Sequence, residues 1–364
     1  MISRVNLHID LKKIQENYLE IVKSCPGCLV MPILKANAYG LGAQKVARSL
    51  GHVGASIFGV ADLNEAKQIS SIVEQVLLLG SMLPQELDQL VIGVSPSISS
   101  FEEAVRYSNF AKSRQLTLKV HILIDTGMGR LGLLIDQAYS EITKIIKLPN
   151  IEVEGIFSHF SSANYDRDFS LYQISQMKVL ITKLSQAGLF FSYCHIANSD
   201  GINNIQESLK QPFNMVRSGI NLFGVFDSQG EHRLNLQSVL KLKSKLVAKR
   251  FLKKGSPIGY SQSHILSKDT WVGTVPIGYA DGVPQNLSEK AFFYYKDQAY
   301  QIIGKVSMDY TMIDLGANCD LSLGQDIDIL RGTQDIVNWA KIKGTIPYDI
   351  ICSIGNRVKR VYES

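Results

Sequence analysis

Residues 29–42 read LVMPILKANAYGLG, an apolar run that leads into a lysine, a glycine-containing turn and then a helical pattern. This order predicts a buried strand with Lys35 at its carboxyl end. An amine in such a place loses its proton easily when water is excluded, and it can then attack a carbonyl group. A lysine that snorkels at a strand end is the simpler interpretation, and this stretch alone does not decide between the two.

The same alternation of a short apolar run and an amphipathic stretch recurs from residue 29 to residue 225. The predicted strands are 29–34, 56–60, 75–79, 90–94, 118–124, 153–157, 193–196 and 215–223, and the predicted helices include 64–73, 101–114, 136–147 and 169–187. Eight strand–helix units predict an α/β fold, a (β/α)8 TIM-type barrel. A doubly wound parallel sheet is the competing interpretation, but it would not need eight roughly even units.

After Gly224 the pattern changes to short alternating segments separated by turns, which predicts a second, mainly antiparallel β domain. Its predicted strands are 238–251, 270–277, 299–306, 311–314 and 326–330, and one late helix is predicted at 333–343. We therefore expect a barrel domain over residues 11–228. The β domain would take residues 229–364 together with an N-terminal strand, 1–10, and the stretch 227–233 would link the two domains.

The composition is that of an ordinary globular protein, with 364 residues, 45% hydrophobic and 20% charged. The net charge of +5 comes from scattered basic residues, so nucleic-acid binding is not expected. Neither a signal-peptide core nor an apolar run of membrane-spanning length is found, and we expect a cytoplasmic protein. The five cysteines are too few for a disulfide framework, and Cys25 and Cys28 lack a second pair for zinc, so no metal site is expected.

Polar residues stand at the predicted carboxyl ends of several strands, where barrels place their active sites. They are Lys35, Asp125 with Arg130, His159, Asn198 with Ser199, and Arg217 with Gly219 and Ile220. Each alone is often a cap or a turn residue. The last two groups follow the seventh and eighth strands, where barrels commonly bind a phosphate. A lysine after the first strand, opposite a phosphate clamp, is the arrangement that a pyridoxal phosphate enzyme needs.

Ordered motifs that run through almost the whole chain make the sequence resemble the alanine racemase family. The matching stretches are 9–11, 34–42, 125–132, 158–160, 195–199, 259–260, 276–282, 306–309 and 357–358. The family consists of a (β/α)8 barrel followed by a C-terminal β domain and uses pyridoxal 5'-phosphate. The resemblance therefore implies the same fold and cofactor for this chain.

By matching position, the resemblance implies that Lys35 holds the cofactor as a Schiff base and acts as one of two catalytic bases. Tyr260 would be the second base, on the opposite face of the substrate. The other residues implied to surround the cofactor are Tyr39, Arg130, His159, Asn198, Ser199, Arg217, Gly219 and Ile220. Those implied to reach the substrate are Arg130, Tyr279, Met308 and Asp309. In the family the matches of Tyr260, Met308 and Asp309 come from the partner subunit, so a homodimer with shared active sites is implied.

Arg217, which would face the pyridine nitrogen, distinguishes between reactions. A guanidinium cannot accept a ring proton, so the carbanion formed from the substrate would be less delocalised and would regain a proton quickly. The presence of Arg217 at this position therefore favours racemisation over decarboxylation. A phenol with an ordinary pKa near 10 needs nearby positive charge to act as a base, and His159 with Arg217 would supply it for Tyr260.

Some positions depart from the family pattern. Leu123 stands where many members carry a lysine that becomes a carbamate and orients the arginine equivalent to Arg130. A leucine cannot do so, and Arg130 would need another acceptor, an anion or water. We therefore expect activity that does not depend on bicarbonate. Leu41, Asn356 and Lys359 also replace common family residues, and they are expected at the entrance and substrate shell.

The predicted function is the interconversion of L-alanine and D-alanine, which would supply D-alanine for peptidoglycan synthesis. One alternative is a racemase for another small amino acid, such as serine, because the departures lie in the predicted substrate shell. Another is a low-activity pyridoxal phosphate-binding protein that regulates cofactor supply. Proteins of that kind are single barrels, so the predicted β domain argues against it.

Overall fold

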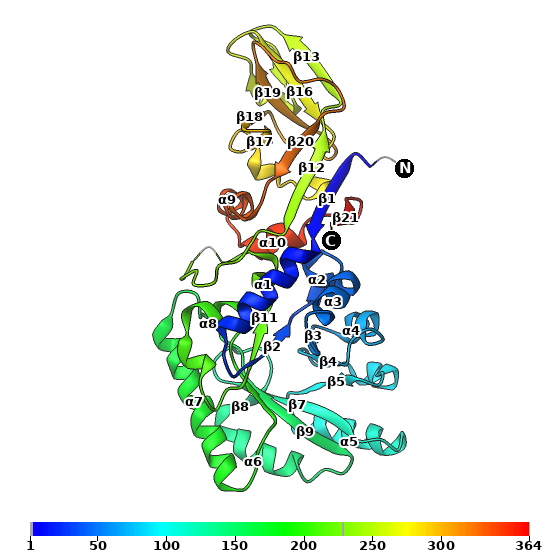
Figure 1. Cartoon of the computed structure of the whole chain (residues 1–364), viewed down its shortest axis with the longest axis vertical. Coiled ribbons are helices and arrows are strands. Elements are labelled where there is room, and N and C mark those ends of the chain that lie inside the picture. The colour runs from blue at the N-terminus through cyan, green and yellow to red at the C-terminus, as the bar shows by residue number, and fades with distance from the viewer. Residues whose placement is uncertain (1–2, 228, 364) are drawn as a thin grey trace. The chain divides into compact units, whose positions relative to one another are not determined.

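The computed structural model describes residues 3–227 and 229–363, and its chain divides into two compact units (Figure 1). One unit is Ile14–Gln237, and the other combines Met1–Lys13 with Ser238–Ser364. The barrel was predicted to span residues 11–228, so its unit begins three residues and ends nine residues later than expected. The domain bounds themselves stay a prediction. The predictions for Met1, Ile2, Ser228 and Ser364 fall outside the described residues.

Parallel strands close into a barrel in the unit Ile14–Gln237. In pairing order they are β2 (Leu29–Pro32), β3 (Ile57–Val60), β4 (Gln75–Leu78), β5 (Val94–Ser95) with β6 (Ser97–Ile98), β7 (Leu118–Asp125), β9 (Ile151–Phe157), β10 (Tyr193–His195) and β11 (Met215–Ser218). A parallel bridge between Ile33 and Gly59 links β2 to β3, and β11 pairs with β2. Because only Pro96 separates β5 from β6, these two count as one barrel strand. The ring then closes with eight strands. The predicted barrel is confirmed, and an open doubly wound sheet is excluded.

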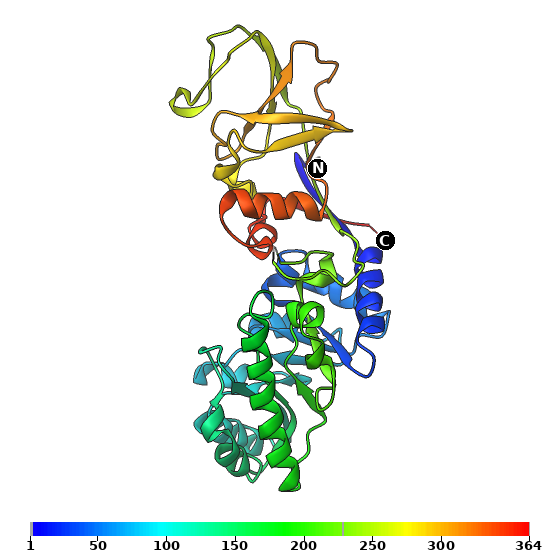
Figure 2. The same cartoon turned by 90° about the vertical axis from the view of Figure 1, so that its left-hand side faces the viewer.

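Helices surround these strands, as both views show (Figures 1 and 2). They are α1 (Leu11–Ser24), α3 (Ala43–Gly51), α4 (Leu63–Ile69), α5 (Phe101–Ser113), α6 (Ile135–Ile145), α7 (Arg167–Gln186) and α8 (Ser199–Asn204). Five of them begin where a polar side chain accepts the backbone N–H three residues on: Asp10 for α1, Asp62 for α4, Ser100 for α5, Asp166 for α7 and Asn198 for α8. The apolar faces of the helices pack on strands that are buried almost throughout.

The other unit contains a sheet that is antiparallel except where β1 pairs with β21. In spatial order its strands are β13 (Ala248–Leu252), β16 (Thr270–Val275), β19 (Thr311–Gly316), β18 (Gln298–Ile303), β17 (Phe292–Tyr295), β20 (Asp326–Leu330), β12 (Leu240–Lys245), β1 (Val5–Asp10) and β21 (Lys359–Glu363). A separate hairpin pairs β14 (Pro257–Ile258) with β15 (His264–Ile265). The predicted mainly antiparallel β domain is confirmed, and its predicted helix is α9 (Thr333–Lys343).

Some element predictions are wrong in part, and the single strand predicted at 238–251 is two strands, β12 and β13, separated by Leu246 and Val247. Of the strand predicted at 90–94 only Val94 belongs to β5, because Gly93 turns the chain with φ 84°. The strand predicted at 215–223 ends at Ser218, and Ile220–Phe223 forms a 3-10 helix. The predicted single late helix is followed by a second, α10 (Pro347–Cys352). Within the described residues no helix is long and apolar enough to cross a membrane.

Candidate active site

A cavity of about 210 Å³ lies at the carboxyl ends of the barrel strands, lined by strand residues and by residues that follow the strands. It brings together Lys35, Arg130, His159 and Arg217, which the sequence placed at four different strand ends. Its other walls are Ala61, Leu79, Gly80, Leu123, Ile124, Met128, Leu131 and Phe157. The lining thus combines basic groups with apolar side chains and contains no carboxylate.

Lys35 opens a short turn, α2 (Lys35–Tyr39), whose backbone is left-handed. Its next four residues, Ala36 to Tyr39, all have φ between 52° and 57°. Left-handed runs of residues with a Cβ are unfavourable, so the surroundings must hold this one in place. The amide of Ala36 donates to Glu65 Oε1 at 2.6 Å, and the other oxygen of that carboxylate accepts from Ala61 N at 2.8 Å. The chain before Lys35 is fixed by Leu34 N, which donates to Gly59 O at 2.8 Å.

The predicted phosphate ligands meet beside the end of β11. Gly219 N donates to Ser199 Oγ at 3.0 Å, and the Tyr39 hydroxyl lies so close to Gly219 that any Cβ there would collide with it. Asn198 Oδ1 accepts from Gly201 N at 2.8 Å and so caps α8. Ile220 is buried at the start of the 3-10 helix. The structure therefore gathers Tyr39, Ser199 and Gly219 and gives Asn198 a capping contact.

Arg130 lies on a loop shaped by Asp125. The Oδ1 atom of Asp125 accepts from the backbone N–H groups of Gly127, Met128 and Gly129 at 2.8, 2.8 and 3.1 Å. Arg130 itself is exposed, and the described residues offer it no hydrogen bond or ion pair. Leu123, only 6% exposed, lies in the same cavity wall. No protein acceptor that could replace a carbamate is thus found for Arg130 among the described residues of this chain.

Arg217 is only 3% exposed and is held by several acceptors. Its Nη2 donates to Ser158 O at 2.7 Å and to Ile196 O at 3.0 Å, and it lies 3.1 Å from His159 Nδ1. Its Nη1 lies 2.7 Å from His195 Nδ1. No partner is found in the described part of the chain for the Nε–H. Arg217 therefore lines the cavity with its orientation fixed and with its Nε–H still available.

His159 corrects one expectation. Burial, followed by the charges of Arg217, Arg130 and Lys35, lowers the pKa of His159 to about 3. The imidazole is therefore neutral, and because Arg217 can only donate, Nδ1 of His159 accepts and Nε2 carries the hydrogen. Any positive charge that assists a neighbouring base must come from Arg217, with His159 acting as a neutral donor.

Tyr260 lies in the β unit at the tip of the β14–β15 hairpin and is 70% exposed. The next residue, Ser261, has φ 59°, so the tip is tightly bent. The hairpin is tied to its neighbours by His264, whose Nδ1 lies 2.9 Å from Glu289 Oε2, and Glu289 Oε1 accepts from Gly304 N. The phenol is thus presented outward on a fixed support.

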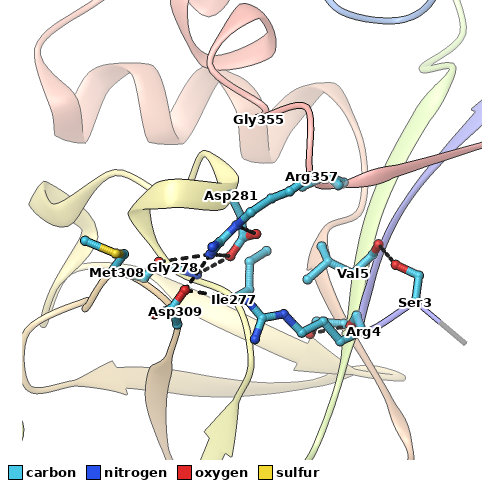
Figure 3. A network of polar contacts seen from close by, with 12 residues as sticks. Ser3, Arg4, Val5, Ile277, Gly278, Asp281, Met308, Asp309, Gly355 and Arg357 are labelled. Carbon is cyan, nitrogen blue, oxygen red and sulfur yellow. Dashed lines mark hydrogen bonds and ion pairs between the residues drawn. The ribbon is translucent and has the colours of Figure 1, made fainter.

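Met308 and Asp309 lie on a loop that Arg357 joins to the turn after β16 (Figure 3). Arg357 Nε donates to Asp281 Oδ1 at 2.6 Å, and its Nη2 donates to Asp309 Oδ1 at 2.9 Å and to Met308 O at 3.3 Å. Ser307 O in the same loop also accepts a hydrogen bond from Tyr279 N at 3.0 Å. Arg357 lies in one of the matching stretches but had no predicted role, and it thus fixes the predicted substrate residues Met308 and Asp309 relative to one another.

Some residues that shape the barrel site were missed. Phe157 lines the cavity, His195 contacts Arg217, and the hydroxyl of Ser158, the residue before His159, lies 2.7 Å from that of Thr126. His195 opens one of the matching stretches, and a histidine within an otherwise apolar strand was a signal that could have found it. Leu41 is fully buried, so the prediction that it lies at an entrance is wrong. Among the described residues, no cluster of three or more histidines, cysteines and carboxylates is placed to hold a metal.

Comparison with known proteins agrees with these features. The family model for the N-terminal domain of alanine racemase matches residues 9–227, and the model for the C-terminal domain matches residues 239–362. The chain belongs to the alanine racemase family. An alanine racemase of Desulforamulus reducens is 32% identical over 97% of this chain and 97% of its own length. One of Clostridium tetani is 34% identical over 97% of this chain and 94% of its own.

Solved alanine racemases have the same fold. That of Clostridium difficile 630 superposes with a TM-score of 0.93 at 28% identity and covers 100% of this chain and 96% of its own. That of Bartonella henselae, with covalently bound pyridoxal phosphate, superposes with a TM-score of 0.87 at 28% identity and covers 100% of both chains. The alanine racemase family thus accounts for both units of this chain.

Proposed function

We propose that this protein interconverts L-alanine and D-alanine. The observation that carries the proposal is the cavity that combines Lys35 with the buried guanidinium of Arg217 and contains no carboxylate. A lysine supplies an amine that can be covalently attached to a carbonyl cofactor and can also move a proton. A guanidinium at the ring nitrogen favours return of that proton over decarboxylation.

The residues present fit pyridoxal 5'-phosphate. The basic groups of Lys35, Arg130 and Arg217 suit an anionic ligand, Phe157 and Leu79 supply apolar walls, and the Nε–H of Arg217 can donate to a ring nitrogen. Tyr39, Ser199 and Gly219 would hold the phosphate, because hydroxyl and backbone N–H groups converge there. When bound, the cofactor supplies the electron sink that acidifies the α-hydrogen of the substrate.

The proton transfers themselves fall to Lys35 and Tyr260. Lys35 would serve one face of the substrate and Tyr260 the other, so that a proton removed from one side is replaced from the opposite side. His159 would donate its Nε2–H, since its Nδ1 faces Arg217. Met308, Asp309 and Tyr279 would shape the substrate side, and Arg130 would bind the cofactor or the substrate carboxylate.

A homodimer follows from this division of labour. Tyr260, Tyr279 and Met308 are exposed on the β unit, and their exposure supports a site completed between two chains. In that dimer Tyr260 of the partner subunit would face Lys35. We further propose a cytoplasmic protein that supplies D-alanine for peptidoglycan synthesis, as the family does.

The activity is tested with purified protein loaded with pyridoxal phosphate and given L-alanine, D-alanine or L-serine. Racemisation of alanine at higher kcat/KM than serine is expected, and absence of any racemisation would reject the function. Faster turnover of serine would favour a serine racemase, which the exposed departures Asn356 and Lys359 leave open. Lys35→Ala should abolish both racemisation and the visible absorbance of the attached cofactor.

A further inference from the structure

Arg217 is a buried cation that contacts no carboxylate among the residues that the structure describes. Its described partners are two carbonyl oxygens, Ser158 O and Ile196 O, and the ring nitrogens of His159 and His195. A charge removed from water is costly unless an opposite charge or several hydrogen bonds offset that removal. Polar contacts nevertheless connect the guanidinium to one carboxylate, that of Glu154 on β9.

A chain of two imidazoles leads from Arg217 to that anion. Arg217 Nη1 lies 2.7 Å from His195 Nδ1, and His195 Nε2 lies 3.0 Å from His121 Nδ1. His121 Nε2 lies 3.8 Å from Glu154 Oε2. The last distance is longer than a hydrogen bond, so this link is an electrostatic contact between a buried N–H and a buried carboxylate. His121 and His195 are fully buried, and Glu154 is 8% exposed.

The chemistry of the two ends gives this chain one direction. Arg217 can only donate, so His195 Nδ1 must accept, and a neutral His195 then carries its hydrogen on Nε2. That hydrogen points to His121 Nδ1, which leaves the hydrogen of His121 on Nε2, facing Glu154. Burial lowers the pKa of both histidines, so both are neutral. Every hydrogen in the chain therefore points from the guanidinium toward the carboxylate.

The barrel is locally shaped to hold this chain. Val120 pairs with Val153 and His121 pairs with Gly155, so Glu154 forms a bulge that has no partner on β7. A Cβ at Gly155 would overlap the His121 ring, so glycine is required there for the ring to lie against β9.

Aromatic rings cover both imidazoles. Phe157 stacks on His195 with ring centroids 4.8 Å apart, and Tyr193 stacks on His121 at 5.8 Å. These stacks fix both imidazoles within the barrel core.

Glu154 is ionised and anchored at the far end. Contact with His121, followed by Lys119 and Gln75, lowers the pKa of Glu154 to about 2. Lys119 Nζ lies 2.9 Å from Glu154 Oε1 and is 51% exposed on its side chain, and Gln75 Nε2 donates to Oε2 at 2.6 Å. The carboxylate is thus a permanent negative charge at neutral pH, placed behind the two histidines.

We propose that Glu154 is the counter-anion of Arg217, acting through His121 and His195, and that these three positioning residues hold the guanidinium in place. The hydrogen bonds of Arg217 with His195 and of His195 with His121 polarise one another, and the charge of Glu154, 3.8 Å from His121 Nε2, adds to this polarisation electrostatically, so His195 Nδ1 becomes a stronger acceptor for Arg217. The kinetic consequence rests on the proposed role of Arg217 beside the cofactor. The arrangement of hydrogens does not depend on that role, and it can be measured on protein without cofactor.

The first measurement is nitrogen NMR on protein labelled at its seven histidines, in the absence of cofactor. His195 and His121 should both be neutral with the hydrogen on Nε2. A hydrogen on Nδ1 of His195 would overturn the proposal, because Arg217 could not then donate to that atom. This NMR measurement uses the wild-type protein, so it tests the proposal even if the variants described next do not fold.

The second measurement compares Glu154→Gln with Glu152→Gln, a matched control on the exposed side of the same strand. Glu154→Gln removes the charge at nearly constant size. It should shift the His195 Nδ1 resonance, although the two residues do not touch, and lower kcat about tenfold in both directions with KM for alanine within about twofold. Glu152→Gln should change neither.

If Glu154 serves only to join β7 to β4, Glu154→Gln will lower the unfolding midpoint but leave the His195 resonances and kcat as in the wild type. That result overturns the proposal. If the tautomers are as expected and the wild type does not racemise alanine, the proposed function fails while the arrangement of hydrogens stands. The two failures are therefore distinguishable.

Discussion

His159 and Arg217 together set the electrostatics of the barrel site. Because Arg217 donates to the Nδ1 side of His159 and burial keeps the ring neutral, the permanent charge in this pair is that of the guanidinium. A phenol brought near His159 Nε2 would thus meet a neutral donor with a cation behind it. The stabilisation of a phenolate there depends on Arg217 more than on the protonation of His159.

The neutral histidines predict how stability changes with pH. A folded-state pKa near 3 for His159 lies below the ordinary value near 6.5, so the unfolded chain binds a proton that the folded chain does not between these pH values. The stabilisation that comes from the neutral His159 should be fully present above pH 6.5. The free energy of unfolding should therefore fall as the pH drops toward 3. His121 and His195, whose pKa values are also lowered by burial, act in the same direction.

Urea unfolding between pH 8 and pH 4 would measure this fall. His159→Asn should show a shallower fall than the wild type, and His52→Asn, at an exposed position, should follow the wild type. A variant His159→Asn that loses stability as steeply as the wild type would mean that His159 is protonated in the folded protein.

Leu123 predicts independence from bicarbonate. Its buried isobutyl group cannot form a carbamate, and Arg130 has no protein partner among the described residues that carbon dioxide could modify. Racemisation in carbonate-free buffer should therefore change less than about twofold when bicarbonate is added. Strong activation by bicarbonate would show that another group in the cavity is carbamylated.

At the scale of elements, the left-handed turn α2 is the most unusual feature of the site. Two residues separate it from the end of β2, and Lys35 at its start lines the cavity while the Tyr39 hydroxyl at its end lies against Gly219. Two amides on either side of the site, Ala36 N and Ala61 N, share the carboxylate of Glu65. Glu65 therefore holds the turn against the loop after β3.

A pair of substitutions at Ala36 tests this turn. Ala36→Val puts a β-branched residue at φ 52° and should lower the free energy of unfolding by about 1 kcal/mol or more, and weaken cofactor binding. Ala36→Gly, which relieves the same backbone, should stay within about 0.5 kcal/mol of the wild type or exceed it. Denaturant unfolding and cofactor titration measure both, and equal effects of the two variants would contradict a left-handed Ala36.

Much of the element order could be predicted from the sequence because apolar runs and helical periodicity are local signals. Lys35 after β2 and Arg217 in β11 were placed by their strands, and α9 was predicted with its bounds. The strand predicted at 90–94 failed because an apolar loop has the same composition as a strand. The spacing of apolar residues gives no sign that the chain turns at Gly93.

Other features depend on contacts between distant segments and could not be predicted. The bulge at Glu154 becomes visible only when β9 pairs with β7, and the orientation of His121 depends on Gly155 across that pairing. The neutrality of His159 likewise depends on burial and on Arg217, far along the chain. The positive φ values of Ala36 to Tyr39 could not be predicted from the sequence, because residues of these types also occur in ordinary right-handed helices.

At the scale of the whole molecule, the predicted catalytic groups lie in different units, Lys35 in the barrel and Tyr260 in the β unit. If each site joins the two groups from different chains, mixing Lys35→Ala with Tyr260→Phe subunits will produce heterodimers with one intact site. About a quarter of the wild-type activity should then return after unfolding and refolding a 1:1 mixture. No recovery, although mixed dimers form, would place both groups in the same chain.

Two bases on opposite faces are the central claim, and the exchange of the α-hydrogen in D₂O tests it most directly. Tyr260→Phe leaves Lys35 as the only base, so one enantiomer of alanine should exchange its α-hydrogen for deuterium and keep its configuration. The other enantiomer should exchange far more slowly, and racemisation should be strongly reduced. Equal exchange of both enantiomers in this variant would contradict the assignment of Tyr260 and Lys35 to opposite faces.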